Sequence, residues 1–196
     1  MKRIFFAALS AMMLVACGAP TEKITITEQG VGPIVLGATA DAFPATFEGL
    51  YDEIVVEHID AYFDDWMGED MPASDNYTFK RGGVDVAMLT INEGETVREI
   101  SIVDPELDYK GVRVGSTLAE AFAAGAQLFA GGMYGSCEFY CEFKIDKVIF
   151  KLNNIFNADV PYEELDFGAF HQLDWGIEKY DTEAKVESIV VNNYEW

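Results

Sequence analysis

Positively charged residues are scarce in this chain of 196 residues. Lysine and arginine together number 13, against 34 aspartates and glutamates, and the formal net charge is −21. Nucleic-acid binding needs a basic surface that displaces counterions from phosphates. An amphipathic helix that lies on anionic lipid also needs a basic face. The composition therefore excludes nucleic acid as a partner and such a helix as the membrane contact.

Residues and motifs of the common enzyme classes are also scarce. The chain has two histidines, His58 and His171, and no serine stands in a Gly-x-Ser-x-Gly motif. It has no Walker loop, no Gly-x-Gly-x-x-Gly motif and no His-x-x-x-His pair. We therefore expect no enzymatic activity, no cofactor and no transition-metal site.

Long hydrophobic runs are absent except near the N-terminus. Lys2 and Arg3 precede a mainly apolar run of 13 residues, 4–16. A membrane-spanning helix needs about 20 apolar residues, so this run is too short to span. A charged start, a short apolar core and small residues at its end are typical of an export signal.

The end of this run, Leu14-Val15-Ala16-Cys17-Gly18, resembles the lipobox of bacterial lipoproteins. The resemblance implies a signal peptide over residues 1–16, cleavage before Cys17 and lipidation of Cys17, with residues 17–23 as a tether. Gly18 in place of aspartate implies sorting to the outer membrane, with the folded part facing the periplasm. The alternative is an ordinary secretory signal followed by a chance cysteine.

Two cysteines, Cys137 and Cys141, are left once Cys17 is lipidated. An even pair in an exported protein is typical of a disulfide, and we expect these two residues to bond to each other. The alternatives are a thiol nucleophile, which needs a nearby base, and half of a zinc site, which needs two further ligands.

Two sequence blocks occur twice. Residues 34–43 resemble residues 112–122 with an offset of 78 from Gly37 to Gly115, and residues 97–103 resemble residues 186–191 with an offset of 89. The difference in offset indicates an insertion in the second half. We predict a tandem duplication of a strand–helix–meander unit. The first unit covers residues 24–104, and the second covers residues 105–196 and contains the insertion at 153–172.

The second unit contains the strongest helix signal. Thr117 and Glu120 form a capping-box pattern, and apolar residues recur at helical spacing up to Phe129, before Gly131-Gly132. In the first unit Pro44 limits the corresponding helix. Alternating segments and tight turns such as Arg81-Gly82-Gly83 predict strand hairpins elsewhere. We therefore predict an α+β fold, with helices packed on one face of antiparallel sheet.

Several of these features together resemble the YfeY-like family of small bacterial outer-membrane lipoproteins, which has no known function. They are the lipobox, an Ile-Thr-x-x-Gly-x-Gly-Pro-Ile strand over 26–34, Asp104-Pro105 at a strand end, Gly-x-x-x-Gly before a helix over 111–129, and the cysteine pair. The resemblance covers most of residues 24–152 and weakens after them. It implies fold and location only.

The densest acidic stretch, residues 60–70, also carries aromatic residues. Tyr62, Phe63, Trp66 and Met67 suit a protein contact, although the same side chains could instead close the edge of the core. Four carboxylates of this stretch could supply oxygen ligands for Ca²⁺: Asp64, Asp65, Glu69 and Asp70. Their spacing is not that of an EF-hand loop, so the competing interpretation is an acidic loop that is simply exposed to solvent.

His58 lies in a strand-like run close to this stretch. It could serve as a general base beside Asp60, but a partly buried structural histidine is the safer interpretation. We expect a lipid-anchored envelope protein that acts as a periplasm-facing binding or scaffold module, with another envelope protein as partner. The alternative is a hydrolase or a ligand- or Ca²⁺-binding protein that uses the segment from His58 to Asp70.

The lipobox leads to a prediction about processing. Mass spectrometry of protein extracted from membranes should find an N-terminal peptide that begins at Cys17 and carries diacylglycerol, and Cys17→Ser should release the protein from the membrane. An unmodified Cys17, or an intact Met1, would contradict it.

Overall fold

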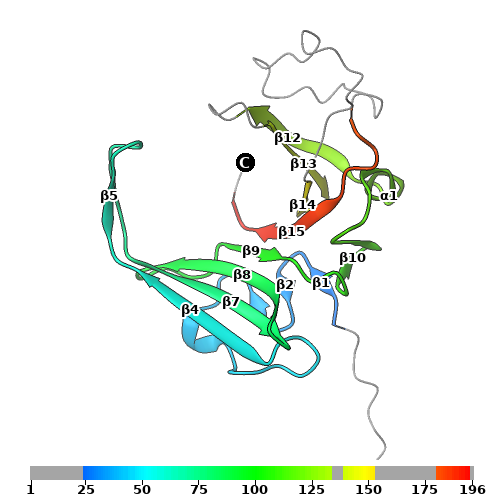
Figure 1. Ribbon diagram of the computed structural model, residues 1–196. Coiled ribbons are helices and arrows are strands. Elements are labelled where there is room, and N and C mark those ends of the chain that lie inside the picture. Colours follow the sequence, from blue (N-terminus) through cyan, green and yellow to red (C-terminus); the bar gives the residue numbers. More distant parts are fainter. Residues whose placement is uncertain (1–23, 134–138, 153–179, 195–196) are drawn as a thin grey trace, which may run out of the picture.

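The computed structural model describes residues 24–133, 139–152 and 180–194. Its main element is an eight-stranded antiparallel sheet with the strand order β12-β13-β14-β15-β9-β8-β7-β4 (Figure 1). The strands are β4 (Glu53–Ile59), β7 (Ser74–Arg81), β8 (Val84–Asn92), β9 (Glu99–Ile102), β12 (Gln127–Met133), β13 (Phe139–Ile145), β14 (Val148–Leu152) and β15 (Val186–Asn192).

Three small sheets accompany the large one. Their strands are β1 (Ile26–Thr27), β2 (Gly30–Val31) and β3 (Ile34–Val35) in the first, β10 (Asp108–Tyr109) and β11 (Val112–Arg113) in the second, and β5 (Tyr62–Asp64) and β6 (Glu69–Met71) in the third. The described helices are the 3₁₀-helix η1 (Ala40–Ala42) and the α-helix α1 (Leu118–Ala123).

The prediction of an α+β fold is wrong, because the described chain is mostly strand. The capping box of α1 is present, since the Thr117 side chain accepts from the Glu120 amide and the Glu120 carboxylate accepts from the Thr117 amide. The helix nevertheless ends at Ala123. Gly125 has a φ of +98°, which a helix cannot continue, and residues from Gln127 pair with β13 instead.

The first-unit helix is shorter still. It is the single turn η1, and Pro44 has no amide hydrogen with which to extend it. Helices this short cannot form a layer over a sheet. The hairpin predicted at Arg81-Gly82-Gly83 is confirmed, because β7 and β8 pair on either side of Gly82-Gly83.

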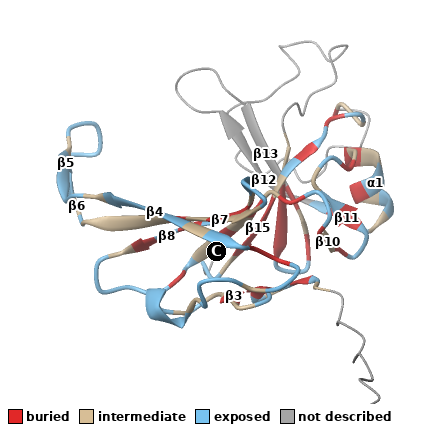
Figure 2. Ribbon diagram, turned by 60° about the horizontal axis from the view of Figure 1, so that its bottom comes forward, coloured by how far each residue is buried: buried red, intermediate tan, exposed pale blue. Residues whose placement is uncertain are grey.

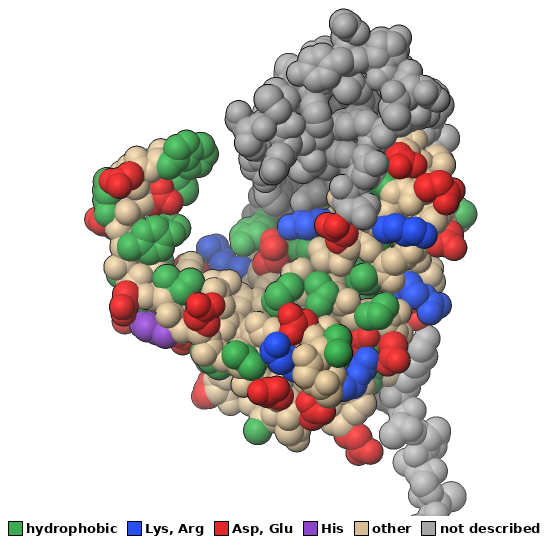
Figure 3. All heavy atoms as spheres, viewed as in Figure 1, with side chains coloured by type: hydrophobic (Ala, Val, Ile, Leu, Met, Phe, Trp, Pro, Cys, Tyr) green, Lys and Arg blue, Asp and Glu red, His purple; other side chains and the backbone are tan. Residues whose placement is uncertain are grey.

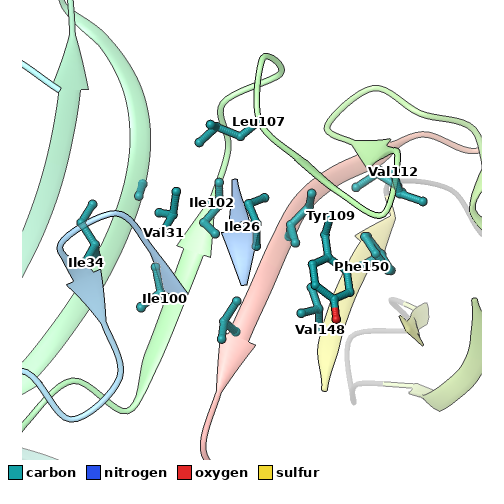
Figure 4. Close-up of a cluster of buried hydrophobic side chains, with 14 of the residues drawn as sticks. Ile26, Val31, Ile34, Ile100, Ile102, Leu107, Tyr109, Val112, Val148 and Phe150 are labelled. Atoms are coloured by element: carbon teal, nitrogen blue, oxygen red, sulfur yellow. The ribbon is translucent and has the colours of Figure 1, made fainter. Parts of the chain in front are cut away.

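One face of the large sheet carries the core. Adjacent strands place a continuous row of apolar side chains on it: Phe79, Ala87, Ile102, Ile189, Phe150 and Phe143. All six are fully buried. The short strands β1 to β3 and β10 to β11 supply further buried residues that meet this row, as the close-up in Figure 4 shows for Ile26, Val31, Tyr109 and Val112. Burial of this apolar area is the main force that holds the small sheets to the large one.

The large sheet consists of two antiparallel meanders that meet at β9 and β15. One contains β4, β7, β8 and β9, and the other contains β12 to β15. At the junction Ile100 faces Val191 and Ile102 faces Ile189, and all four side chains are inaccessible to solvent. The meanders are therefore continuous through their hydrogen bonds and through their core.

The two repeated sequence blocks make matching backbone hydrogen bonds. The Gly37 amide donates to the Val97 carbonyl (2.8 Å), and the Val97 amide donates to the Ala38 carbonyl (2.9 Å). In the second block the corresponding bonds are Gly115 to Val186 (2.8 Å) and Val186 to Ser116 (2.9 Å). The duplication as a whole stays a prediction, and its insertion at 153–172 lies outside the described residues.

An ion pair between the half-buried Arg81 and the buried Asp104 connects the end of β7 to the segment that joins the meanders. Nη2 of Arg81 lies 2.8 Å from Oδ2 of Asp104, whose side chain is 3% exposed. That oxygen accepts no hydrogen bond in the described structure, so the charge of Arg81 alone compensates it. Arg81 also donates to the carboxylate of Glu106 (2.7 Å) and to the carbonyl of Gly49 (3.1 Å).

This ion pair leads to a prediction about stability. Arg81→Ala should lower the free energy of unfolding by about 3 kcal/mol in urea denaturation, because it leaves the carboxylate of Asp104 buried without a countercharge. The control is Lys80→Ala, which removes the neighbouring ion pair with the much more exposed Asp85 and should cost less than about 1 kcal/mol. Equal losses in the two variants would contradict the prediction.

Candidate functional site

The acidic and aromatic stretch forms a projecting hairpin. β5 follows β4 after Asp60-Ala61, and β6 leads into β7 through Pro72-Ala73, so the hairpin extends the β4–β7 pair beyond the large sheet. We call residues 60–73 the arm. Figure 1 shows it reaching away from the rest of the chain, and Figure 2 shows that it is largely exposed.

The tip of the arm is an ordered turn. Oδ1 of Asp64 accepts hydrogen bonds from the amides of Trp66 and Met67, both at 2.9 Å, and the carbonyl of Asp64 accepts from the amide of Gly68 at 2.7 Å. Asp64 therefore satisfies donors that a tight turn would otherwise leave open. The turn holds the backbone of Trp66 and Met67 at the end of the arm.

Four large apolar side chains of the arm face solvent. They form what we call the arm patch, and their exposed fractions are 50% for Tyr62, 56% for Phe63, 93% for Trp66 and 52% for Met67. Figure 3 shows hydrophobic side chains gathered on the arm, apart from the body of the molecule. Of the two interpretations open from the sequence, the structure excludes the one in which these residues close the edge of the core. A group of exposed aromatic residues on one projecting element marks an interaction site.

The acidic residues of the arm do not converge on a point. Asp64 faces Glu69 across the hairpin, and Asp70 faces Phe63. In the part of the chain that the structure describes, no three histidine, cysteine, aspartate or glutamate side chains are placed to hold a metal ion. The set Asp64, Asp65, Glu69 and Asp70 thus lacks the converging geometry that Ca²⁺ binding requires.

His58 lies at the root of the arm and is exposed, which corrects the expectation of a partly buried histidine. Its side chain is 62% accessible, its Nδ1 is 2.8 Å from Oδ1 of Asp75, and its Nε2 is 3.4 Å from Oδ1 of Asp60. The hydrogen bond with Asp75 is the main reason that the pKa of His58 is raised. Sequence reasoning identified Asp60 and missed Asp75, because that contact depends on the register of β4 against β7.

A second cluster of ionisable residues, Tyr109, Lys110 and Asp146, lies where the β10–β11 hairpin meets the β13–β14 turn. The carboxylate of Asp146 accepts from the hydroxyl of Tyr109 (2.8 Å) and pairs with Lys110. The contact with Lys110, and then that with Tyr109, lowers the pKa of Asp146. Burial and the same hydrogen bond raise the pKa of Tyr109 to about 12. These interactions join β10 to the β13–β14 turn and are structural.

The described residues form open grooves on and beside the large sheet. One, of about 590 Å³, is lined by β4, β7, β8 and β9 residues and by Tyr194. Its polar lining includes Glu57, Asn76 and Thr78 beside β4, and at the β9 side Arg98, which pairs with Glu95 at 3.7 Å. Another, of about 380 Å³, is lined mainly by the β1–β2 turn, the β13–β14 turn and the end of β15. The first groove borders the edge strand from which the arm extends.

Three of the residues singled out in the sequence lie outside the described part. They are Cys17, Cys137 and His171. The backbone of Cys141 is described and lies in β13 opposite Gly131. Lipidation of Cys17 and the Cys137–Cys141 disulfide therefore stay predictions. No helix in the described ranges has both the length and the apolar character needed to cross a bilayer.

Comparison with known proteins gives one structural match to report. No protein-family profile and no curated protein matches the sequence. The structure is similar to the crystal structure of the uncharacterized protein YfeY from Escherichia coli, at 16% sequence identity and a TM-score of 0.47, over 86% of this chain and 99% of that one. The protein matched is of the kind that the sequence resembles, the YfeY-like proteins. Lipidation, location and activity are not tested by it.

The contacts of His58 lead to a prediction about pH. An NMR titration should give His58 a pKa above its ordinary value of 6.5, and Asp75→Asn should bring it back towards that value. Because the folded-state pKa is raised, the ion pair stabilises the fold below pH 6.5 and this contribution is lost as the pH rises through the folded-state pKa. His58→Gln identifies the signal against His171. A pKa at or below 6.5 would contradict the prediction.

Proposed function

We propose that this protein is a lipid-anchored component of the bacterial envelope that binds another envelope protein through the arm patch. The lipobox resemblance supports lipidation at Cys17, and Gly18 supports sorting to the outer membrane. The projecting arm with its exposed Trp66 supports binding of a partner protein. Together they describe a periplasm-facing binding or scaffold module that is tethered to the membrane through a short linker.

The exposure of the arm patch is the observation that best supports binding. Trp, Tyr, Phe and Met are the residue types that protein interfaces favour, and tryptophan is frequent among residues that contribute most to affinity. Such side chains gain free energy only when a partner covers them. The hydrogen bonds of Asp64 order the turn in advance, which lowers the entropic cost of binding.

The hydrolase and Ca²⁺ alternative has less geometric support. His58 does contact two carboxylates, but it lies on an exposed strand, and the open groove beside β4 is lined by Glu57 and not by His58. Catalysis by a histidine–carboxylate pair also requires a site that orients substrate and excludes water. The acidic side chains of the arm supply no converging ligand set in the described structure.

Site-specific photocrosslinking in living cells tests this function. A photoreactive amino acid in place of Trp66 should capture one reproducible envelope protein, identified by mass spectrometry. Trp66→Ala should lower the yield of that complex from a second crosslinking position at Tyr62 by about tenfold, while the melting temperature stays unchanged because the side chain is almost fully exposed.

The matched control is Val84, which is 65% exposed at the far end of β8. A photoreactive residue there should not capture the same protein, and Val84→Ala should leave the yield unchanged. Capture from Val84 as efficient as from Trp66, or no capture from the arm, would contradict binding through the arm patch.

A further inference from the structure

We propose that the outer edge of β4 accepts an extended, lysine- or arginine-bearing segment of the partner as an added strand. This inference rests on the proposed function and deepens it. The arm patch supplies apolar contact at one end of the surface, and the edge of β4 supplies backbone hydrogen bonds and charge along the rest. The occupant is therefore a basic polypeptide in the β conformation.

The first observation is that β4 is an open edge. It is the terminal strand of the eight-stranded sheet, and within the described residues it pairs with β7 on one side and with no strand on the other. It is seven residues long, and its Val55 and Val56 are 41% and 51% exposed. An exposed edge of this length presents a row of unpaired amides and carbonyls that pair readily with another strand.

The second observation is the charge along this edge. β4 contains Glu53 and Glu57, Asp60 follows it directly, and the one side chain of these residues that can carry a positive charge is His58. On the neighbouring strand Lys80 faces Glu53, so Glu57 is the carboxylate of β4 that has no lysine or arginine opposite it. Between Lys23 and Lys80 the sequence contains no lysine or arginine, but it contains twelve acidic residues: Glu28, Asp41, Glu48, Asp52, Glu53, Glu57, Asp60, Asp64, Asp65, Glu69, Asp70 and Asp75.

This one-sided charge selects the occupant. A second copy of the chain would place one acidic edge against another, and like charges on neighbouring strands repel. An anionic bilayer would be repelled by the same carboxylates. A strand with lysine or arginine on alternate positions would instead place opposite charges beside Glu53 and Glu57. The edge is thus protected from self-association while it stays open to a basic partner.

The third observation is the position of the larger groove. Val55 faces Thr78 and Glu57 faces Asn76 across the β4–β7 pair, and Glu57, Asn76 and Thr78 all line the groove. An added strand would lie directly beside this lining. Alternate side chains of that strand would extend over the β4 side of the groove, where the carboxylate of Glu57, the amide of Asn76 and the hydroxyl of Thr78 can accept hydrogen bonds from a lysine or arginine. Arg98 lines the same groove and pairs there with Glu95.

Hydrogen exchange followed by NMR tests the mode of binding, with a peptide of alternating lysine and valine as the probe. The peptide should slow exchange of the outward-facing β4 amides at least about fivefold, and a peptide of alternating glutamate and valine should not. A lysine–valine peptide with alternate backbone amides methylated keeps its charge but loses donors. It should bind at least about tenfold more weakly, because strand addition depends on those donors.

Variants of the full chain test the role of charge. The double variant Glu53→Lys, Glu57→Lys should bind the lysine–valine peptide about tenfold more weakly, or weaker still, because it replaces attraction by repulsion. The control is Glu187→Lys, which alters an exposed residue of β15 and should change the affinity less than about twofold. Circular dichroism of each variant checks that the fold is kept.

Several results would overturn the inference. They are equal binding of the methylated and unmethylated peptides, protection of residues other than β4, dimerisation of the chain through β4 in analytical ultracentrifugation, or protection of β4 by anionic vesicles. Capture of a protein from Trp66 without protection of β4 by the peptide would leave the proposed function standing and remove this inference. Protection of β4 by the peptide without capture from Trp66 would leave strand addition at β4 standing and remove binding through the arm patch.

Discussion

The pairing of β9 with β15 is the constraint on which the rest of the structure depends. Each meander has one apolar face that must be covered, and each ends in a strand, β9 or β15, whose isoleucine and valine side chains are buried. Because Ile100 and Ile102 face Val191 and Ile189, the two strands complete a single core as they complete a single sheet. The small sheets β1–β3 and β10–β11 then cover a face that neither meander would present alone. Loss of this pairing would expose the centre of the core.

The arm is a consequence of the same arrangement. Joining the meanders at β9 and β15 places β4 at the outer end of the sheet, where its hairpin can extend into solvent without a packing partner. Burial of apolar area stabilises the body, whereas the arm is held by backbone pairing and by the hydrogen bonds of Asp64. The exposure of Trp66 therefore serves no purpose in folding, which is the physical reason to connect it with binding.

The charge of the chain gives the proposed binding surface its selectivity. β4 and the arm carry acidic residues and His58 but no lysine or arginine, because the sequence contains none between Lys23 and Lys80. The neighbouring strand β7 ends in Lys80 and Arg81. Attraction of a basic partner and repulsion of a second copy are two effects of the same carboxylates. The raised pKa of His58 keeps its positive charge at the root of the arm to a higher pH than an ordinary histidine would, and its hydrogen bond to Asp75 connects β4 to β7 where the arm begins.

Local features were determined by the sequence itself, and they are the ones that depend on neighbouring residues. The capping box of Thr117 and Glu120 and the Gly82-Gly83 hairpin both depend on short-range chemistry, and the structure has both. The lipobox at Cys17 is also a short-range pattern, and its lipidation stays a prediction. The helix predicted up to Phe129 failed because Gly125 ends it and because pairing with β13 makes a strand of the residues that follow. The contact of His58 with Asp75 and the exposure of Trp66 were decided by the tertiary structure alone. Register brings together residues that are distant in sequence, and whether an aromatic side chain is buried depends on what packs against it.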